Sequence, residues 1–488
     1  MPLSSVILII ICAFMFAPLF FAEIARGKAL PVGENFFLQS RTLRIFPMYA
    51  TVLATWMSAF AFMGAISYFY DQGPIYMTTI GWDALFALLF YVIGRRIWYY
   101  GKVNGYTTAT DFFHDIYGSR KLDVIVTVMS FVFTTLYLEL QLVGGVLLIQ
   151  VATEGYISWQ VSGLLFFAIL VIYLWAGGLR AVALADTFYM VFIIVTILAS
   201  GLFLMRFAGG TEHVFEEVMK KGIEYVTLDN SKRSILWISL FIIVPVGAFM
   251  GPQMWIRNYA AKEERNFEIL PLLLCLTSII CVGTFFAGNA GLVLVPEMEN
   301  NDALIATMLL KYANPIFCTL IFLGITATIF STANSQIHAM STMYTVDVHK
   351  RYISKNLPER SIVSVAKWSV LFISAIAYMI LLIIPQNLFD MGTLALGGLS
   401  QLIIPVIGAL FWKNATGKGA ISGLLTGELL FIALAFFSPL DNSFSGVIAL
   451  LANGIVFVAA SLLMGSEKET SEKVMEYRSR FIHTQSKP

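Results

Sequence analysis

Apolar segments long enough to cross a lipid bilayer recur along the whole sequence, and they restrict its fold more than any other feature. A helix needs about 20 residues to cross the ~30 Å hydrocarbon core, where its backbone groups find no water to bond. Only 12% of the 488 residues are charged, whereas a soluble protein carries about 25%. We therefore predict an all-α polytopic membrane protein with thirteen transmembrane helices, near residues 3–22, 45–69, 75–98, 122–152, 158–178, 181–206, 235–257, 268–296, 305–344, 362–385, 389–412, 416–438 and 442–464.

Lys and Arg are distributed unevenly among the predicted connections. Alternate connections and the C-terminal tail hold 25 of the 31 basic residues, and Arg257 is counted among them. Cytoplasmic loops carry the excess of Lys and Arg, so the N-terminus is predicted outside and the C-terminus in the cytoplasm, as an odd number of spans requires. The expected localisation is the plasma (inner) membrane, with the lipid bilayer as a partner.

The sequence predicts one transmembrane transporter domain, residues 1–465, followed by a charged cytoplasmic tail, residues 466–488. It contains no Walker-type nucleotide motif, no CxxC pair, no nucleophile–base pairing and no histidine cluster. Neither an enzyme, nor nucleic-acid binding, nor an obligatory protein partner is therefore expected. Many spans without a water-soluble domain are typical of a transporter or channel.

Two of the predicted spans carry residues that interrupt helices. The second span has small and polar residues around Ala54 and then Gly64, and the seventh has Pro245, Gly251 and Pro252 close together. Proline removes a backbone donor and glycine lowers helix preference, so these spans are predicted to be broken, although kinked and tightly packed helices would give the same pattern.

The two broken spans lie five spans apart, which is the spacing expected of inverted repeats. The repeats would cover approximately residues 45–206 and 235–412, with one helix before them and two after. Transporters of this kind bind substrate near the midplane, where broken helices expose backbone groups.

The stretch "TATIFSTANSQ", residues 326–336, places hydroxyl groups in a very apolar region. Thr328, Ser331, Thr332 and Ser335 follow an i, i+3, i+4, i+7 spacing, so they share one face of a helix. Hydroxyls together with freed backbone carbonyls provide oxygen ligands for a hard cation. The same spacing is also typical of hydroxyls that hold neighbouring helices together.

Four acidic residues fall within or near the apolar segments. Asp186 lies near the predicted cytoplasmic end of its span, where it would serve a cation or pair with a neighbouring donor. Glu139 and Glu428 lie deeper, where an ionisable group is costly and by default functional unless it is protonated and hydrogen-bonded. Asp83 is predicted to be solvated near the outer surface and is assigned no role.

Three stretches resemble signatures of a known family, in the same order: "NGYTTATDFFHDIYGSR" (104–120), "YLWAGGLRAVALAD" (173–186) and "IFSTANSQIHAMSTMYTVDVHKR" (329–351). The chain resembles the sodium/solute symporter family, which includes bacterial proline and sialic acid transporters and animal sodium/glucose cotransporters. The resemblance covers nearly the whole membrane part. It implies a LeuT-like five-plus-five fold with one extra N-terminal and two extra C-terminal helices, and secondary active transport driven by Na⁺.

The resemblance also implies where sodium binds. The family's site uses two backbone carbonyls of the first core helix, which correspond here to Ala54 and Met57. A carbonyl and two hydroxyls of the eighth core helix complete the site, and they correspond to Thr328, Ser331 and Thr332.

Some family members have a second sodium site, for which the matching residues here are Asp186 and Ser335. Asn334 stands where those members carry serine, so the number of sodium ions stays open.

The solute is less constrained than the ion. Val244 and Ala248 stand where proline transporters carry aromatic residues, and "GPQMWIRNYAAK" (251–262) is closer to the monocarboxylate and pantothenate branches. The resemblance thus implies a small organic acid. No Lys or Arg is expected at the midplane to neutralise it, which leaves helix N-termini, hydroxyls and sodium for that task. The candidate substrate-binding residues are Trp56, Ser58, Phe60, Gln141, Phe249 and Gln253.

Two alternatives remain open at this stage. One is a proton-coupled transporter of the same fold, with Glu139 or Asp186 as the proton carrier. The other is a membrane sensor that acts through a separate partner protein.

Overall fold

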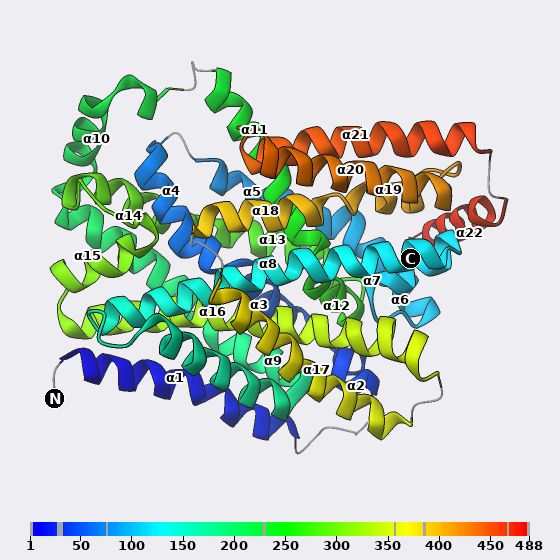
Figure 1. Cartoon of the computed structure of the whole chain (residues 1–488), viewed down its shortest axis with the longest axis horizontal. Coiled ribbons are helices and arrows are strands. Elements are labelled where there is room, and N and C mark those ends of the chain that lie inside the picture. Colours follow the sequence, from blue (N-terminus) through cyan, green and yellow to red (C-terminus); the bar gives the residue numbers. More distant parts are fainter. Residues whose placement is uncertain are drawn as a thin grey trace.

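The computed structural model describes residues 3–26, 33–74, 77–227, 231–355, 358–383, 387–465 and 468–485. Its regular elements are helices, most of which run roughly along the long axis of the molecule (Figure 1). In chain order the α-helices are α1 (Leu3–Arg26), α2 (Gly33–Leu38), α3 (Ile45–Trp56), α4 (Ala65–Gln72), α5 (Thr78–Leu89), α6 (Arg95–Asn104), α7 (Ala109–Tyr117), α8 (Arg120–Ala152), α9 (Trp159–Phe207), α10 (Gly210–Lys221), α11 (Ser231–Met250), α12 (Pro252–Ala260), α13 (Asn266–Thr277), α14 (Cys281–Leu294), α15 (Leu304–Tyr312), α16 (Pro315–Met343), α17 (Glu359–Leu381), α18 (Leu388–Ser400), α19 (Ile403–Phe411), α20 (Gly417–Phe437), α21 (Asn442–Leu463) and α22 (Lys468–Gln485). Short 3₁₀ or π-helical segments, labelled η, include η1 (Gln39–Arg41), η2 (Phe60–Gly64), η4 (Phe90–Gly94), η5 (Ile223–Tyr225), η6 (Ser278–Ile280), η7 (Asn301–Ala303) and η8 (Tyr344–Ile353).

The described residues contain eight helical segments long and apolar enough to cross a membrane, and two bent helix pairs raise the number to ten. Shorter apolar helices, Val6–Ala17 and Trp159–Ile172, lie within two further predicted spans. Parts of three predicted segments lie outside the described residues. These are the start of the span 75–98, the end of the span 362–385 and both ends of the tail 466–488. The polytopic helical class is thus confirmed, and the number thirteen stays a prediction.

Both predicted breaks are present in the structure. The segment Ile45–Trp56 is bent by 57° from Phe60–Gln72, and Met57 between them leaves the helical conformation with φ −77° and ψ 83°. The segment Ser234–Met250 is bent by 58° from Pro252–Ala260, with Gly251 extended at φ −57° and ψ 140°. Each break frees backbone groups from the helical hydrogen-bond ladder.

The two broken helices are tied together at their ends. The Leu43 amide, just before α3, donates to the Ala260 carbonyl at 3.0 Å, and the Lys262 amide donates to the Leu43 carbonyl at 2.9 Å. This bridge places the start of α3 beside the end of α12.

Helix α9 is interrupted at Gly178, the last residue of the predicted fifth span. Its φ of 58° with ψ of −164° is strained for any residue with a side chain, and a Cβ there would lie 2.8 Å from the Phe36 carbonyl oxygen. Helix α9 packs with α3, α14 and α16, while α20 and α21 form a hairpin at the opposite edge from α1 (Figure 1).

Candidate functional site

The break after α3 lies against the hydroxyl-rich face of α16. The Ser331 hydroxyl donates to the Ala54 carbonyl at 2.7 Å and lies 3.0 Å from the Thr328 carbonyl. The Thr332 hydroxyl lies 3.2 Å from the Thr328 carbonyl, 3.1 Å from the Thr55 carbonyl and 3.5 Å from the Ala54 carbonyl. Two carbonyls and two hydroxyls of the predicted sodium set therefore converge from two helices.

These oxygens fit the coordination of a small hard cation. Oxygens at right angles around a cation that binds them at 2.3–2.6 Å, the range of Ca²⁺, lie about 3.3–3.7 Å apart. Of the separations of 2.7–3.5 Å around Ser331 and Thr332, the longest already fits this range, and the shortest would have to widen by about 0.6 Å. The two hydroxyl protons, which now point at carbonyls, would turn away when their oxygens face an ion.

Thr328 and Met57, the other two residues of the predicted sodium set, differ in how they face this cluster. The hydroxyl of Thr328 donates at 2.7 Å to Gly324 on its own helix, so the residue offers its carbonyl to the group. Met57 is buried at the break, and its amide donates to the Leu53 carbonyl at 2.8 Å. No contact of the Met57 carbonyl with α16 is seen in the described residues, so its part in a sodium site stays a prediction.

The predicted second cation pair, Asp186 and Ser335, surrounds a basic side chain. Asp186 accepts a short hydrogen bond from the Thr51 hydroxyl and lies 3.4 Å from Nη2 of Arg257. The same Nη2 donates to the Ser335 hydroxyl at 2.6 Å and to the Thr55 hydroxyl at 2.7 Å. Of the two roles foreseen for Asp186, the structure shows the pairing with a neighbouring donor.

Arg257 corrects one expectation. It does not belong to a solvated connection, because it lies within α12 with its side chain 1% exposed. Arg257 is thus a buried basic side chain inside the helix bundle, and the expectation that no Lys or Arg lies at the midplane stays a prediction. Sequence reasoning placed Arg257 at the end of an apolar run. In the structure the chain bends by 58° at Gly251, and every residue of α12 is buried.

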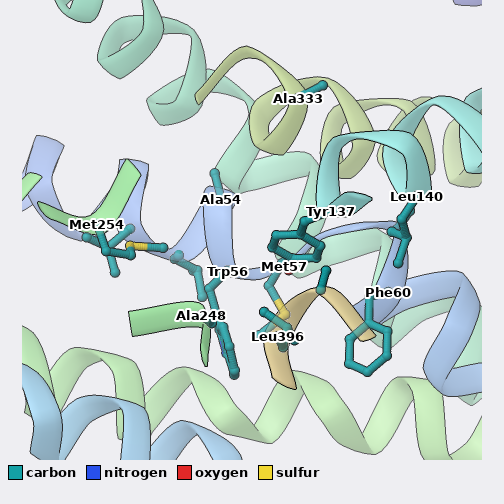
Figure 2. Packing of buried hydrophobic residues seen from close by; sticks show 14 of the residues in the cluster. Ala54, Trp56, Met57, Phe60, Tyr137, Leu140, Ala248, Met254, Ala333 and Leu396 are labelled. Carbon is teal, nitrogen blue, oxygen red and sulfur yellow. The ribbon is translucent and has the colours of Figure 1, made fainter. Parts of the chain in front are cut away.

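Three of the candidate solute residues lie around the break that follows α3. Trp56 stacks on Phe86 with ring centroids 4.3 Å apart, and the Ser58 hydroxyl accepts from Tyr137 at 3.1 Å. Trp56, Met57 and Phe60 lie below Tyr137 in the view of Figure 2, with Leu396 beside Met57, whereas Ala54 lies on the side nearer α16. The solute candidates and the sodium ligands thus flank the same break.

The other three candidates extend this region toward α12. Gln141 on α8 accepts from the Ala59 amide at 2.9 Å, which ties α8 to the break. The Phe249 and Phe86 rings meet edge to face with their centroids 6.5 Å apart, so Phe86 packs between Phe249 and Trp56. Gln253 lies one turn further, beyond the break at Gly251, and its carbonyl accepts from Arg257 at 2.9 Å. All six side chains are buried.

Asp83 is the acidic residue that sequence reasoning misplaced. It is 3% exposed, not solvated, and its carboxylate accepts a short bond from the Trp56 indole and a contact from Cys281 Sγ at 3.6 Å. It lines a narrow hollow with Trp56 and Trp82, whose room of about 20 Å³ suits a single water. Its burial could have been recognised from the sequence, because Asp83 directly follows Trp82 inside a predicted apolar span.

Glu139 and Glu428 are buried as expected. Neither carboxyl group has a hydrogen-bond partner among the described residues. Within the same part of the chain, no group of three or more His, Cys, Asp or Glu side chains could hold a metal ion. The oxygen cluster at the α3 break consists of carbonyl and hydroxyl oxygens, which are donors that hard cations accept.

The sequence matches the model of the sodium:solute symporter family over residues 36–427. The chain belongs to this family. It is therefore a multi-pass membrane transporter and not an enzyme, and members of the family couple a solute to sodium.

The relatives cover nearly the whole chain at low identity. The sodium/pantothenate symporter of Haemophilus influenzae is 24% identical over 94% of this chain and 96% of its own length. The sodium/proline symporter of the same organism is 25% identical over 88% of each chain. Their differing solutes leave the solute of this family member undetermined.

Two solved structures show the same fold. A sodium-coupled sialic acid symporter, in a substrate-bound outward-open state, has a TM-score of 0.78 at 18% identity and covers 96% of this chain and 99% of its own. Mhp1, a nucleobase-cation-symport-1 family transporter in a closed conformation, has a TM-score of 0.59 at 14% identity, over 91% and 98% of the two chains. The predicted LeuT-like class of fold is thereby confirmed.

Proposed function

We propose that this chain is a sodium-driven symporter that imports a small organic acid by alternating access. Sodium would be bound by Ala54, Met57, Thr328, Ser331 and Thr332. The convergence of the Ala54 and Thr328 carbonyls with the Ser331 and Thr332 hydroxyls carries this proposal. Freed carbonyls at a helix break beside hydroxyls are the oxygen donors that a cation needs inside a membrane.

The finer architecture is part of the proposal. It comprises thirteen spans, with inverted repeats over approximately residues 45–206 and 235–412, and one span before and two after them. The near-equal bends of 57° and 58° in the two broken pairs support the repeat relation. The bias of Lys and Arg supports an inner-membrane protein with its N-terminus outside and the tail 466–488 in the cytoplasm.

The solute would contact Trp56, Ser58, Phe60, Gln141, Phe249 and Gln253. Arg257 is unsuited to neutralising a carboxylate solute, because Asp186 already balances its charge. Sodium and the exposed helix ends at the two breaks would meet the negative charge instead. The pantothenate symporter among the relatives supports an organic acid, and Val244 and Ala248 in place of aromatic residues weigh against proline.

The experiment follows thermal unfolding of the purified chain while NaCl replaces KCl at constant ionic strength. An ion at 100 times its dissociation constant stabilises the folded state by about 2.7 kcal/mol. We expect a sodium-specific rise that Ser331→Ala and Thr332→Ala abolish. Thr328→Val is the matched control, because among the described residues its hydroxyl bonds Gly324 alone and its carbonyl remains.

Equal stability in the two salts would refute the sodium site, as would a sodium effect that survives both hydroxyl deletions. Once the sodium response is established, monocarboxylates and pantothenate are added in NaCl and in KCl. We expect further stabilisation by an acid only when sodium is present. Stabilisation by proline in preference to every acid would refute the solute class.

Proton coupling remains a second candidate, and one observation favours it. Glu139 is 1% exposed, and neither of its carboxyl oxygens has a partner among the described residues. A buried unpaired carboxylate is costly, whereas the protonated form is tolerated. Glu139 is therefore able to hold a proton inside the helix bundle, and a Glu139 substitution separates the two mechanisms.

A further inference from the structure

Three segments that are far apart in the chain enclose a hollow with a basic lining. The turn from α7 to α8 contributes Arg120 and Lys121, the start of α20 contributes Lys418, and the start of α22 contributes Lys473. The hollow has a volume of about 470 Å³, and none of the described residues that line it is acidic. Four positive side chains therefore surround one space that is large enough for a small molecule or a headgroup.

Most of this charge is not balanced by the protein. Lys473 donates to the Asp115 carbonyl at 2.8 Å and lies 3.6 Å from the Asp115 carboxylate (Figure 1 shows α7 and α22 at the same end of the molecule). Arg120, Lys121 and Lys418 are exposed, and within the described part of the chain they have no acidic partner. Like charges gathered without counter-charges repel one another, so a bound anion would stabilise this arrangement.

The backbone favours an anion at the same place. Helices α8 and α20 both begin at the hollow, with Ser119 and Thr416 as their capping residues. The first amides of a helix have no acceptor within that helix, and the aligned peptide dipoles place a partial positive charge there. The two helix ends add to the basic side chains, and phosphate oxygens are acceptors that this combination binds.

The surface that continues from the hollow is apolar and exposed. Helices α8 and α20 are long and apolar enough to cross a membrane, and they pack against each other. On α20, Leu425 and Leu429 follow Ile421 of the hollow at four-residue spacing and are 43% and 67% exposed. On α8, three valines follow Arg120 at the same spacing and are about half exposed: Val124, Val128 and Val132. Two apolar stripes thus lead from the basic hollow along the membrane-facing surface, where acyl chains would lie.

We propose that this hollow binds the phosphate headgroup of an anionic phospholipid, with the acyl chains along α8 and α20. Basic pockets between membrane helices bind such headgroups, and the bias of Lys and Arg assigns this side of the chain to the cytoplasm. A free phosphate ion shares the chemistry of the headgroup, but the apolar stripes favour the lipid. The bound lipid would join α22 to α8 and α20, because Thr470 and Lys473 line the same hollow as Lys121 and Lys418. This inference goes beyond the proposed transport of sodium and a solute, and does not depend on it.

The test titrates the purified full chain, in an uncharged detergent, with phosphatidylglycerol and separately with phosphatidylcholine, and native mass spectrometry measures the first lipid bound. We expect the native chain to bind phosphatidylglycerol more tightly. Lys121→Gln combined with Lys418→Gln should weaken phosphatidylglycerol binding about 30-fold, given the usual contribution of two basic residues near an anionic membrane surface. Lys262→Gln combined with Arg265→Gln is the matched control with no expected change, because it removes two exposed positive charges outside the hollow.

Inorganic phosphate separates the two sources of the same chemistry. Added at constant ionic strength, it should compete only weakly with phosphatidylglycerol, because it has no acyl chains to place on the apolar stripes. Phosphate that binds tightly and excludes phosphatidylglycerol would assign the hollow to a free anion and overturn the lipid proposal. Equal binding of the two lipids by the native chain, or equal affinities of the test and control variants for phosphatidylglycerol, would also overturn it.

A measurement on the native chain keeps the proposal falsifiable if the variants do not fold. The Debye length falls from about 10 Å at 0.1 M salt to about 3 Å at 1 M. The preference for phosphatidylglycerol over phosphatidylcholine should therefore decrease when KCl is raised from 0.1 to 1 M. A preference that is the same at both salt concentrations would contradict a headgroup held by exposed basic side chains.

Discussion

Gly247 offers a sharp test of how closely the broken helix α11 packs on α18. A Cβ added at Gly247 would lie 2.1 Å from the Leu396 carbonyl oxygen and 2.8 Å from Leu396 Cα. Ordinary van der Waals contact begins at 3.4 Å. The obstacle is backbone, so no side-chain rotation relieves it, and Gly247→Ala must push the two helices apart by about 1.3 Å along this line.

The free-energy cost follows from overpacking. Forcing a methyl group into a close-packed interior costs about 1–3 kcal/mol, and more where neighbours cannot move. Alanine gains about 0.8–1.0 kcal/mol over glycine as a helix former, which offsets part of this cost. At Gly454 on α21 the added Cβ would meet only Ile404 Cδ1 at 3.6 Å, so Gly454→Ala is the matched control with the same helix gain.

The helix gain cancels between the two variants, so we expect Gly247→Ala to be less stable than Gly454→Ala by the overpacking cost, about 1–3 kcal/mol or more. Thermal or denaturant unfolding of both purified variants in the same detergent measures the difference. Sodium affinity should fall in Gly247→Ala alone. The Gly247 carbonyl accepts from the Gly251 amide at 3.1 Å, so a shift of α11 moves the break and the following helix α12. Arg257 on α12 donates to the Thr55 and Ser335 hydroxyls, which neighbour the proposed sodium ligands. Equal stability and equal sodium affinity of the two variants would refute the close contact between α11 and α18.

Two further predictions concern acidic residues. Glu139→Gln should leave sodium-dependent uptake in proteoliposomes intact and change the free energy of unfolding by less than about 1 kcal/mol, because a neutral amide replaces a carboxyl group without a described partner. If native uptake instead depends on the external pH and Glu139→Gln abolishes it, the result supports proton coupling. Asp302, in η7, accepts from the Leu388 amide at 2.8 Å, and burial raises its pKa from 3.8 to about 6. Stability should therefore be higher below pH 4 and fall by up to about 3 kcal/mol as the pH rises through 6, since the folded state favours the protonated form. Asp302→Asn should lack this part of the pH dependence in unfolding experiments, and an unchanged pH profile would contradict it.

Local chemistry made the class of protein and the two breaks predictable from the sequence. A membrane helix must satisfy its own backbone groups, so each span is visible as an apolar run without knowledge of its neighbours. Pro245, Gly251 and Pro252 interrupt that ladder by their own covalent structure, and the chain is broken at Gly251 as expected. The grouping of Ser331 with Thr332 on one helix face likewise follows from helical periodicity alone.

Only the tertiary structure decided which groups meet across the helices. The Ser331 hydroxyl and the Ala54 carbonyl are 277 residues apart in the chain, and Arg257 and Asp186 are 71 apart. Periodicity describes one helix at a time, so it placed Arg257 in a connection and Asp83 near solvent, whereas packing buries both. The partner that compensates a buried charge comes from another helix, and its position depends on how the broken helices fold back against α9 and α16.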